Sequence, residues 1–171
     1  MNVLGALALS FVLFPLASDP TWSAEDGFTL RAQLPPGTGL AALRKAVNGA
    51  RRRLEQPECQ QLFSEFSDVA GRPLQQNLDA LGQTGASYLE WVVFADASGK
   101  PYCKAGGTFA FTAPGSRVVY VCGSQLSNAA DQNAAKAEAV VIHEMLHSLG
   151  LGENPPTSLE ITARVEARCH P

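Results

Sequence analysis

The sequence has no surplus of basic residues. Its 13 Lys and Arg stand against 16 Asp and Glu, so the 171 residues carry a formal net charge of −3 at pH 7. Proteins that bind nucleic acids neutralise phosphates with cationic side chains, and this balance argues against that class of partner. The same balance gives no case for a polybasic membrane anchor. One local cluster stands out, since Arg44, Lys45 and Arg51, Arg52 and Arg53 share a predicted helix, and we interpret it as a solvated helix face.

The sequence also lacks a hydrophobic run long enough to cross a bilayer. Its apolar stretch from Val3 to Ala17 is shorter than the roughly 20 residues of a membrane-spanning helix and is typical of a signal peptide. We expect a signal peptide over residues 1–18, with cleavage as late as residue 24, and a secreted or periplasmic protein. An uncleaved N-terminal anchor is the alternative. After the signal peptide we expect a Pro- and Gly-rich linker over residues 19–39 and then a single domain over residues 40–171.

Cysteine is scarce, and no two cysteines have the C-x-x-C spacing of a cysteine-rich metal site. The four residues are Cys59, Cys103, Cys122 and Cys169. An even count after an export signal predicts two disulfides, for which three pairings are possible. Because Cys103 and Cys122 flank a predicted hairpin, we pair them with each other, which leaves Cys59 to bond Cys169.

Hydrophobic periodicity and turn residues predict an α+β domain with a small antiparallel or mixed sheet packed on helices. Pro114-Gly115 favours a hairpin turn, and Thr157-x-x-Glu160 is a capping box. Helices are expected over Leu40–Glu55, from Pro57, over Leu74–Leu81, from Ser127 or Asn128 to Leu149 and from Thr157 to Cys169, and strands over Phe28–Ala32, Tyr88–Ala95, Thr108–Phe111 and Val118–Cys122.

One predicted helix carries the pattern His143-Glu144-x-x-His147. On a helix, residues four apart lie one turn above each other on the same face, so both imidazoles can reach one metal ion. Glu144 lies about 100° around the helix, where it can contact a water bound to that metal. The neighbouring residues are apolar, and Gly150 permits the positive φ of a sharp turn after the second histidine.

This stretch resembles the active-site helix of the zincin metallopeptidases. The longer pattern His143-Glu144-x-x-His147-x-x-Gly150-x-x-Glu153 is similar to that of the metzincins over about a dozen residues. It departs from that family in placing Glu153 where metzincins carry His or Asp. It also lacks a Met-turn, since the only methionines are Met1 and Met145. The resemblance therefore implies a zincin-like domain and leaves the subfamily open.

Two histidines leave a catalytic zinc site one protein ligand short of the usual three. Glu153 follows the glycine turn at the metzincin spacing and is our first choice. Glu160 and Glu166 of the last predicted helix are alternatives, the latter because gluzincins take a glutamate from a later helix. His170, beside the C-terminus, is the fourth candidate.

The residues predict a secreted Zn²⁺-dependent peptidase, acting as a monomer on peptide or protein substrates. Glu144 is the expected general base, which accepts a proton from a metal-activated water. The resemblance to zincins also implies that an extended substrate adds to an edge strand beside the active-site cleft, and we expect one of the two strands after Cys103 to form that edge. Two alternatives remain: a zinc-binding module without turnover, acting as a binding protein or inhibitor, and a metal-free scaffold held by disulfides.

Overall fold

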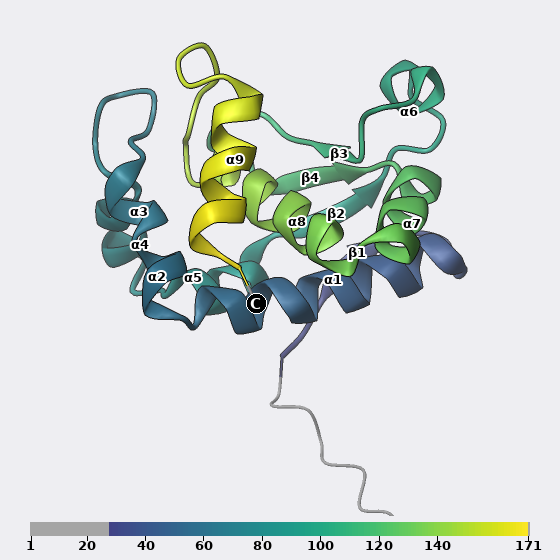
Figure 1. Cartoon of the computed structure of the whole chain (residues 1–171), viewed down its shortest axis with the longest axis horizontal. Helices are drawn as coiled ribbons and strands as arrows, with labels where there is room; N and C mark the ends of the chain where they lie inside the picture. Colours follow the sequence, from purple (N-terminus) through teal and green to yellow (C-terminus); the bar gives the residue numbers. More distant parts are fainter. Residues whose placement is uncertain (1–27, 171) are drawn as a thin grey trace, which may run out of the picture.

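The computed structural model of the chain describes residues 28–170, and the predicted signal peptide lies outside these residues. Most of the helices lie in two runs, one between the first two strands and one after the last strand, as drawn in Figure 1. In order they are β1 (Arg31–Gln33), α1 (Thr38–Leu54), α2 (Pro57–Gln60), α3 (Leu62–Glu65), α4 (Leu74–Leu81), α5 (Gly85–Tyr88), the 3₁₀ turn η1 (Leu89–Trp91), β2 (Val93–Asp96), α6 (Pro101–Ala105), β3 (Ala110–Phe111), β4 (Val118–Val121), α7 (Gly123–Gln132), α8 (Ala134–Ser148) and α9 (Ser158–Arg168).

The four strands form one small mixed sheet in the order β1-β2-β4-β3. The strands β1, β2 and β4 are parallel, and β3 runs antiparallel to β4 with Phe111 opposite Tyr120. Parallel neighbours require crossover connections. The connection from β1 to β2 contains the helices α1 to α5, and the one from β2 to β4 contains α6 and β3. The α+β class with a small mixed sheet is therefore confirmed. Of the two strands after Cys103, β3 is the one at the sheet edge.

The helix α8 lies in the middle of the molecule. It packs on α1, α7 and α9 and on the strands β3 and β4, and in Figure 1 α1 runs along the lower side beneath it. A helix enclosed in this way needs apolar residues around most of its circumference. Val141, Ile142, Met145 and Leu146 meet this need and belong to one continuous core. Polar side chains on α8 are consequently held in fixed surroundings.

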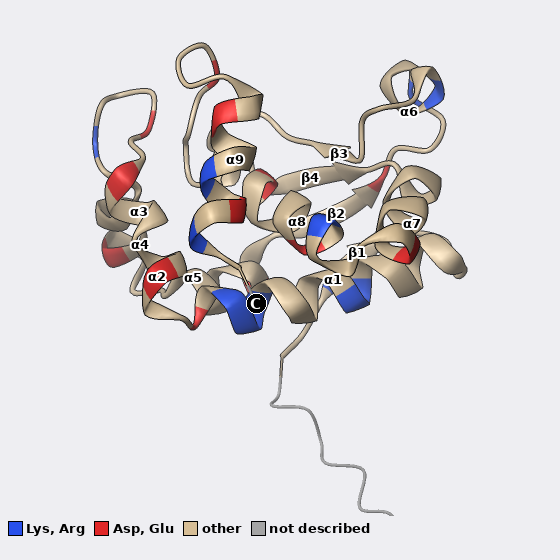
Figure 2. Cartoon of the chain, viewed as in Figure 1, with Lys and Arg blue, Asp and Glu red and all other residues tan. Residues whose placement is uncertain are grey.

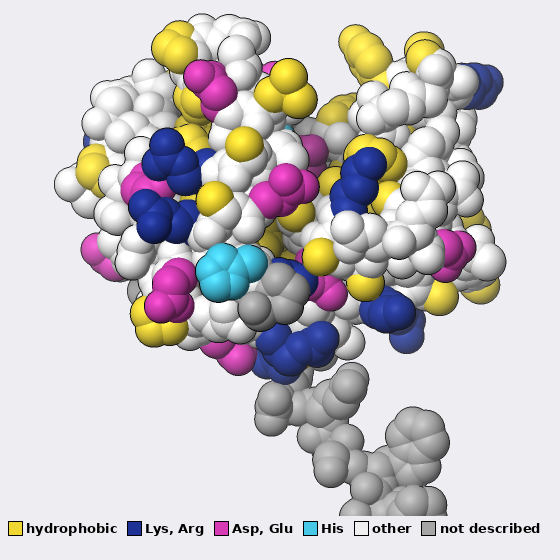
Figure 3. Space-filling view, in the orientation of Figure 1, with side chains coloured by type: hydrophobic (Ala, Val, Ile, Leu, Met, Phe, Trp, Pro, Cys, Tyr) yellow, Lys and Arg dark blue, Asp and Glu magenta, His cyan; other side chains and the backbone are white. Residues whose placement is uncertain are grey.

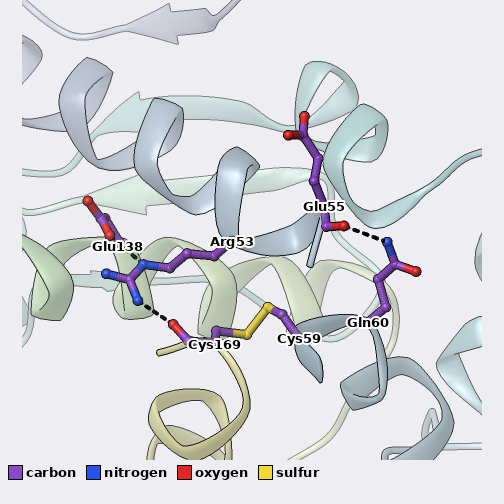
Figure 4. The surroundings of a disulfide bond; sticks show 6 residues. All are labelled: Arg53, Glu55, Cys59, Gln60, Glu138 and Cys169. Carbon is purple, nitrogen blue, oxygen red and sulfur yellow. Dashed lines mark hydrogen bonds and ion pairs between the residues drawn. A yellow bond between two sulfur atoms is a disulfide. The ribbon is translucent and has the colours of Figure 1, made fainter. Parts of the chain in front are cut away.

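Both disulfides have the expected pairing. Cys103–Cys122 ties α6 to the end of β4, and Cys59–Cys169 ties α2 to the end of α9. Such bonds form in an oxidising environment. Figure 4 shows that Arg53 of α1 points to the carboxylate of Glu138 on one side and to the backbone carbonyl of Cys169 on the other.

The interpretation of the basic cluster on α1 as a solvated face is wrong for Arg53, whose side chain is 11% exposed. Packing of α1 against α8 and the chain end explains this, because a buried guanidinium needs acceptors and finds them in Glu138 and the carbonyl of Cys169. The guanidinium of Arg51 lies 5.3 Å from the ring centre of Phe28. Elsewhere Figure 2 shows basic residues on α1, α6 and α9 and acidic residues on α2, α4 and α9.

Three predicted elements have other boundaries. The strand expected over Tyr88–Ala95 begins only at Val93, because a capping box between Thr84 and Ser87 starts helical turns that continue to Trp91. The single helix expected from Ser127 or Asn128 is two helices. Asn133 separates them in an extended conformation, and its side chain accepts a hydrogen bond from the amide of Ala135. The strand expected over Phe28–Ala32 is β1, shifted toward the C-terminus.

The remaining boundaries agree with the sequence to within a few residues. The helix expected over Leu74–Leu81 is α4, ended by Gly82 in the left-handed conformation, and the capping box at Thr157 begins α9. The segment expected to be helical from Pro57 is divided into α2 and α3. Within residues 28–170 no helix combines the length and apolar character needed to cross a bilayer.

Candidate metal centre

The two histidines of α8 face each other across one helical turn. Their Nε2 atoms are 3.0 Å apart, and both side chains are buried. The helix holds them at this spacing because residues four apart share one face. Two nitrogen donors therefore lie close enough to bind the same cation.

Glu153 completes a group of three. Its Oε1 lies 3.2 Å from Nε2 of His147 and 3.8 Å from Nε2 of His143. The carboxylate reaches this position because the chain turns back after α8 at Gly150, which has a φ of 112°. His143, His147 and Glu153 thus form a group that could hold a metal ion.

The other three candidate ligands lie outside this group. Glu160 caps α9, where its Oε2 accepts hydrogen bonds from the backbone amide and the hydroxyl of Thr157 at 2.8 Å each. Glu166 lines a pocket beside His143. Capping therefore accounts for Glu160, and the third donor among the described residues is the one nearest to the second histidine in sequence.

Each histidine has a partner for its second ring nitrogen. The Nδ1 of His147 lies 2.8 Å from the carbonyl oxygen of Leu151, and the Nδ1 of His143 lies 3.0 Å from the hydroxyl of Thr162 on α9. A carbonyl oxygen only accepts hydrogen bonds, so Nδ1 of His147 carries the hydrogen, and in the neutral tautomer with this hydrogen Nε2 presents a lone pair. Such partners orient metal-binding imidazoles. Sequence patterns did not identify either one, because both depend on how the chain packs after α8.

The spacing of the three donor atoms fits a tetrahedral cation such as zinc. Bonds of about 2.05 Å at tetrahedral angles place ligand atoms about 3.3 Å apart, and the three separations here are 3.0, 3.2 and 3.8 Å. Burial, and next the neighbouring His147, lower the pKa of His143 to about 4. The imidazole is therefore neutral near pH 7, the form that binds metals.

Glu144 lines the same pocket as His143, His147 and Glu153 and is 7% exposed. Its Oε2 has no hydrogen-bond partner among the described residues. Burial, and next the charge of Glu153, raise the pKa of Glu144 to about 8, although the backbone amide of Thr112 favours the carboxylate. A buried carboxyl group with an oxygen left unsatisfied is costly, and such groups concentrate where chemistry needs them.

A cleft gives access to these residues. One pocket of about 380 Å³ is lined by His143, Glu144, His147 and Glu153 together with β3 and the residues after it. A second pocket of about 230 Å³ continues along α8 between α9 and residues 107–110. The face drawn in Figure 3 is hollowed between α9 and the region of α7, with hydrophobic side chains inside the hollow. The amide of Gly115 in the β3–β4 turn donates to the carbonyl of His147, which ties the edge of the sheet to α8.

No protein-family model, curated protein or solved structure matches this chain. The possible chemistry of the site therefore follows from the arrangement of its residues alone. That arrangement joins three metal donors, a buried carboxyl group and a sheet edge around one cleft. It permits binding of a divalent cation and proton transfer next to it.

Proposed function

We propose that this chain is a zinc-dependent peptidase of the zincin superfamily, exported from the cell. His143, His147 and Glu153 bind Zn²⁺, and Glu144 is the general base. The observation that carries the proposal is the buried Oε2 of Glu144, which lacks a hydrogen-bond partner among the described residues, in a residue that lines the same pocket as the three candidate metal ligands. An unpaired carboxylate oxygen in this position can accept a proton, and a water molecule in the cleft can donate it.

When bound, zinc supplies a Lewis acid that polarises a carbonyl group and makes a water molecule more acidic. Glu144 accepts a proton from the attacking water and passes it to the leaving amine. Glu144 would be ionised more readily beside a bound cation, which would lower its pKa from the raised value of about 8. Leu151 and Thr162 hold the imidazoles of His147 and His143 in place during these steps.

The substrate is a peptide or protein segment in extended conformation. The strand β3 is at the edge of the sheet and borders the pocket of the metal donors. Its free backbone groups can pair with an added strand, which aligns a peptide carbonyl with the cleft. The adjoining pocket of about 230 Å³ then accepts one substrate side chain.

A zinc-binding module without turnover is the rival function. Structural zinc sites are normally closed by four protein ligands, whereas catalytic sites keep a position for water. Three donors form the group found within residues 28–170, and this number favours catalysis. The presence of Glu144, which a structural site would not need, points the same way.

The test is metal analysis of the purified protein combined with cleavage of a mixed peptide library. The wild type should contain one zinc ion per chain and cleave peptides, lose both properties with a chelator and regain them when zinc is added. Glu144→Gln should keep the zinc and lose cleavage.

Glu160→Gln is the matched control, because it makes the same substitution in a carboxylate outside the donor group and should leave both properties unchanged. A wild type without zinc would support the metal-free scaffold, and a zinc-loaded protein without cleavage would support the binding module.

A further inference from the structure

The turn that follows α8 is held from outside by a distant part of the chain. Three successive backbone carbonyls of this turn each accept a hydrogen bond. The oxygen of Leu149 accepts from Nδ2 of Asn77 at 2.9 Å, and the oxygen of Gly150 accepts from the amide of Val69 at 3.0 Å. The oxygen of Leu151 accepts from Nδ1 of His147 at 2.8 Å. Each residue of the turn from Leu149 to Leu151 is therefore held by a hydrogen bond to its carbonyl oxygen.

Asp68 organises the outer side of these contacts. It is 7% exposed, and its Oδ1 accepts hydrogen bonds from the backbone amides of Ala70 and Arg72 at 2.9 Å each. Its Oδ2 accepts from Nε of Arg72 at 2.9 Å and from Nδ2 of Asn77 at 3.1 Å. The amide of Asn77 has two hydrogens and so joins Asp68 to the carbonyl of Leu149.

Gly150 allows the turn to lie directly against Asp68. Its φ of 112° is disfavoured for residues with a side chain, and an added Cβ would lie 2.9 Å from Cβ of Asp68. An isolated β-bridge joins Asp68 to Leu151 at the same place. The backbone therefore approaches Asp68 as closely as packing permits.

Apolar burial does not explain why the segment after Asp68 lies where it does. Val69, its one large apolar residue before Arg72, is 75% exposed, and Ala70 and Gly71 are exposed as well. The contacts that hold the segment to the turn are polar and directional. Their position, on the turn that carries Glu153 and the carbonyl partner of His147, is where they would affect a bound metal.

We propose that Asp68 and Asn77 are positioning residues of the metal centre, which set the place of Glu153 and the orientation of His147 through the turn at Leu149–Leu151. This inference rests on the proposed zinc site. No hydrogen bond found among residues 28–170 joins Asp68 or Asn77 to the side chains of the three donors, so the effect passes through the backbone. Partners of metal ligands that lie beyond the ligands themselves typically contribute about 10- to 100-fold to metal affinity.

The test compares Asn77→Ala with Gln75→Ala on the same helix. Gln75 is a polar side chain of α4 that bonds only to Asp79 among the contacts found, at 2.8 Å, and so serves as the matched control. Zinc affinity is measured by competition with a chromogenic chelator, and the visible spectrum of the Co²⁺-loaded protein reports the geometry of the ligands. Asn77→Ala should weaken zinc binding roughly 10- to 100-fold and change the Co²⁺ spectrum, whereas Gln75→Ala should change neither.

A combination with Glu153→Gln separates positioning from a general loss of structure. If Asn77 acts mainly by placing Glu153, the double variant should bind zinc only slightly more weakly than Glu153→Gln alone, because coupled residues are not additive. Fully multiplied losses would overturn the proposal. Gly150→Ala disturbs the same contact from the other side and replaces Asn77→Ala should the latter not fold.

The outcomes also separate this inference from the proposed function. A wild type that binds no zinc would overturn the proposed function itself. A wild type that binds zinc and cleaves peptides, while Asn77→Ala behaves like Gln75→Ala, would overturn only the positioning role.

Discussion

Two carboxyl groups on α8, one in each half of the helix, are buried to almost the same extent. Glu138 is 9% exposed and Glu144 is 7% exposed. The carboxylate of Glu138 forms an ion pair with Arg53, which also reaches the carbonyl of Cys169 beside a disulfide. Glu144 has an oxygen with no partner among the described residues and a pKa raised to about 8.

The difference teaches how one helix can serve two purposes. Burial costs a charged group several kcal/mol, and a partner offsets this cost in the first half of α8. In the second half the described residues provide no ion-pair partner for Glu144, and its pKa is raised instead. Glu138 therefore has a stabilising role in the fold, whereas Glu144 has the proposed chemical role.

The largest expected effect is on turnover. Glu144→Gln should lower the rate of peptide cleavage roughly 10²- to 10⁴-fold, the range that a positioned general base contributes. Glu138→Gln keeps the shape of the side chain at the other end of the comparison, and its folded fraction should cleave at close to the wild-type rate. Steady-state kinetics corrected for the folded fraction checks both. An equal loss of cleavage rate in the two variants would contradict the different roles assigned to Glu138 and Glu144.

The next largest effect is on stability, and here we expect the change at Glu138, rather than the one at Glu144, to be harmful. Glu138→Ala leaves the guanidinium of Arg53 buried without its carboxylate, which should lower the free energy of unfolding by about 3–5 kcal/mol. Arg53→Met combined with Glu138→Met removes both charges and should recover much of that loss. Urea denaturation of each protein gives the values. A stable Glu138→Ala protein would show that the ion pair is not needed.

A smaller effect depends on pH and concerns the metal-free protein. The pKa of Glu144 is raised from 4.5 to about 8 on folding, so the folded state holds a proton that the unfolded state releases. Its contribution to stability is fully present below pH 4.5 and is lost as the pH rises to about 8. Glu144→Gln lacks this loss and should become more stable than the wild type by a few kcal/mol between these limits. Unfolding curves at pH 4.5 and pH 8 measure the change, and parallel behaviour of the two proteins would contradict it.

The smallest effect concerns substrate choice in the pocket beside the metal centre. Lys136 and Glu166 line this pocket from α8 and α9, and the ammonium of Lys136 lies 4.7 Å from the ring centre of Phe109. Lys136→Glu should shift the preference toward basic substrate side chains, and Glu166→Lys toward acidic ones. Because such charges are partly solvated, each shift in kcat/KM should be roughly two- to five-fold. Paired peptides differing at one residue provide the measurement, and unchanged ratios would place substrate selection elsewhere.

Local signals in the sequence predicted much of the fold. Gly82 and the capping box at Thr157 mark helix ends through contacts within a few residues, and these boundaries were correct. The capping box at Thr84 is just as local, yet the β-forming residues after Tyr88 concealed it. Arg53 was misjudged for a different reason, since its burial depends on Glu138 and Cys169 far along the chain.

By itself the sequence determined the spacing of His143, Glu144 and His147, because one helical turn places residues four apart on the same face. Only the tertiary structure decided that Glu153 lies with the two histidines in a group that could hold a metal ion, and that β3 rather than β4 lies at an edge of the sheet. It also decided that Asp68 and Asn77 hold the turn between them. The physical reason is range: helix geometry acts over a few residues, whereas a donor cluster is closed by hydrogen bonds and packing between segments that meet only when the chain is folded.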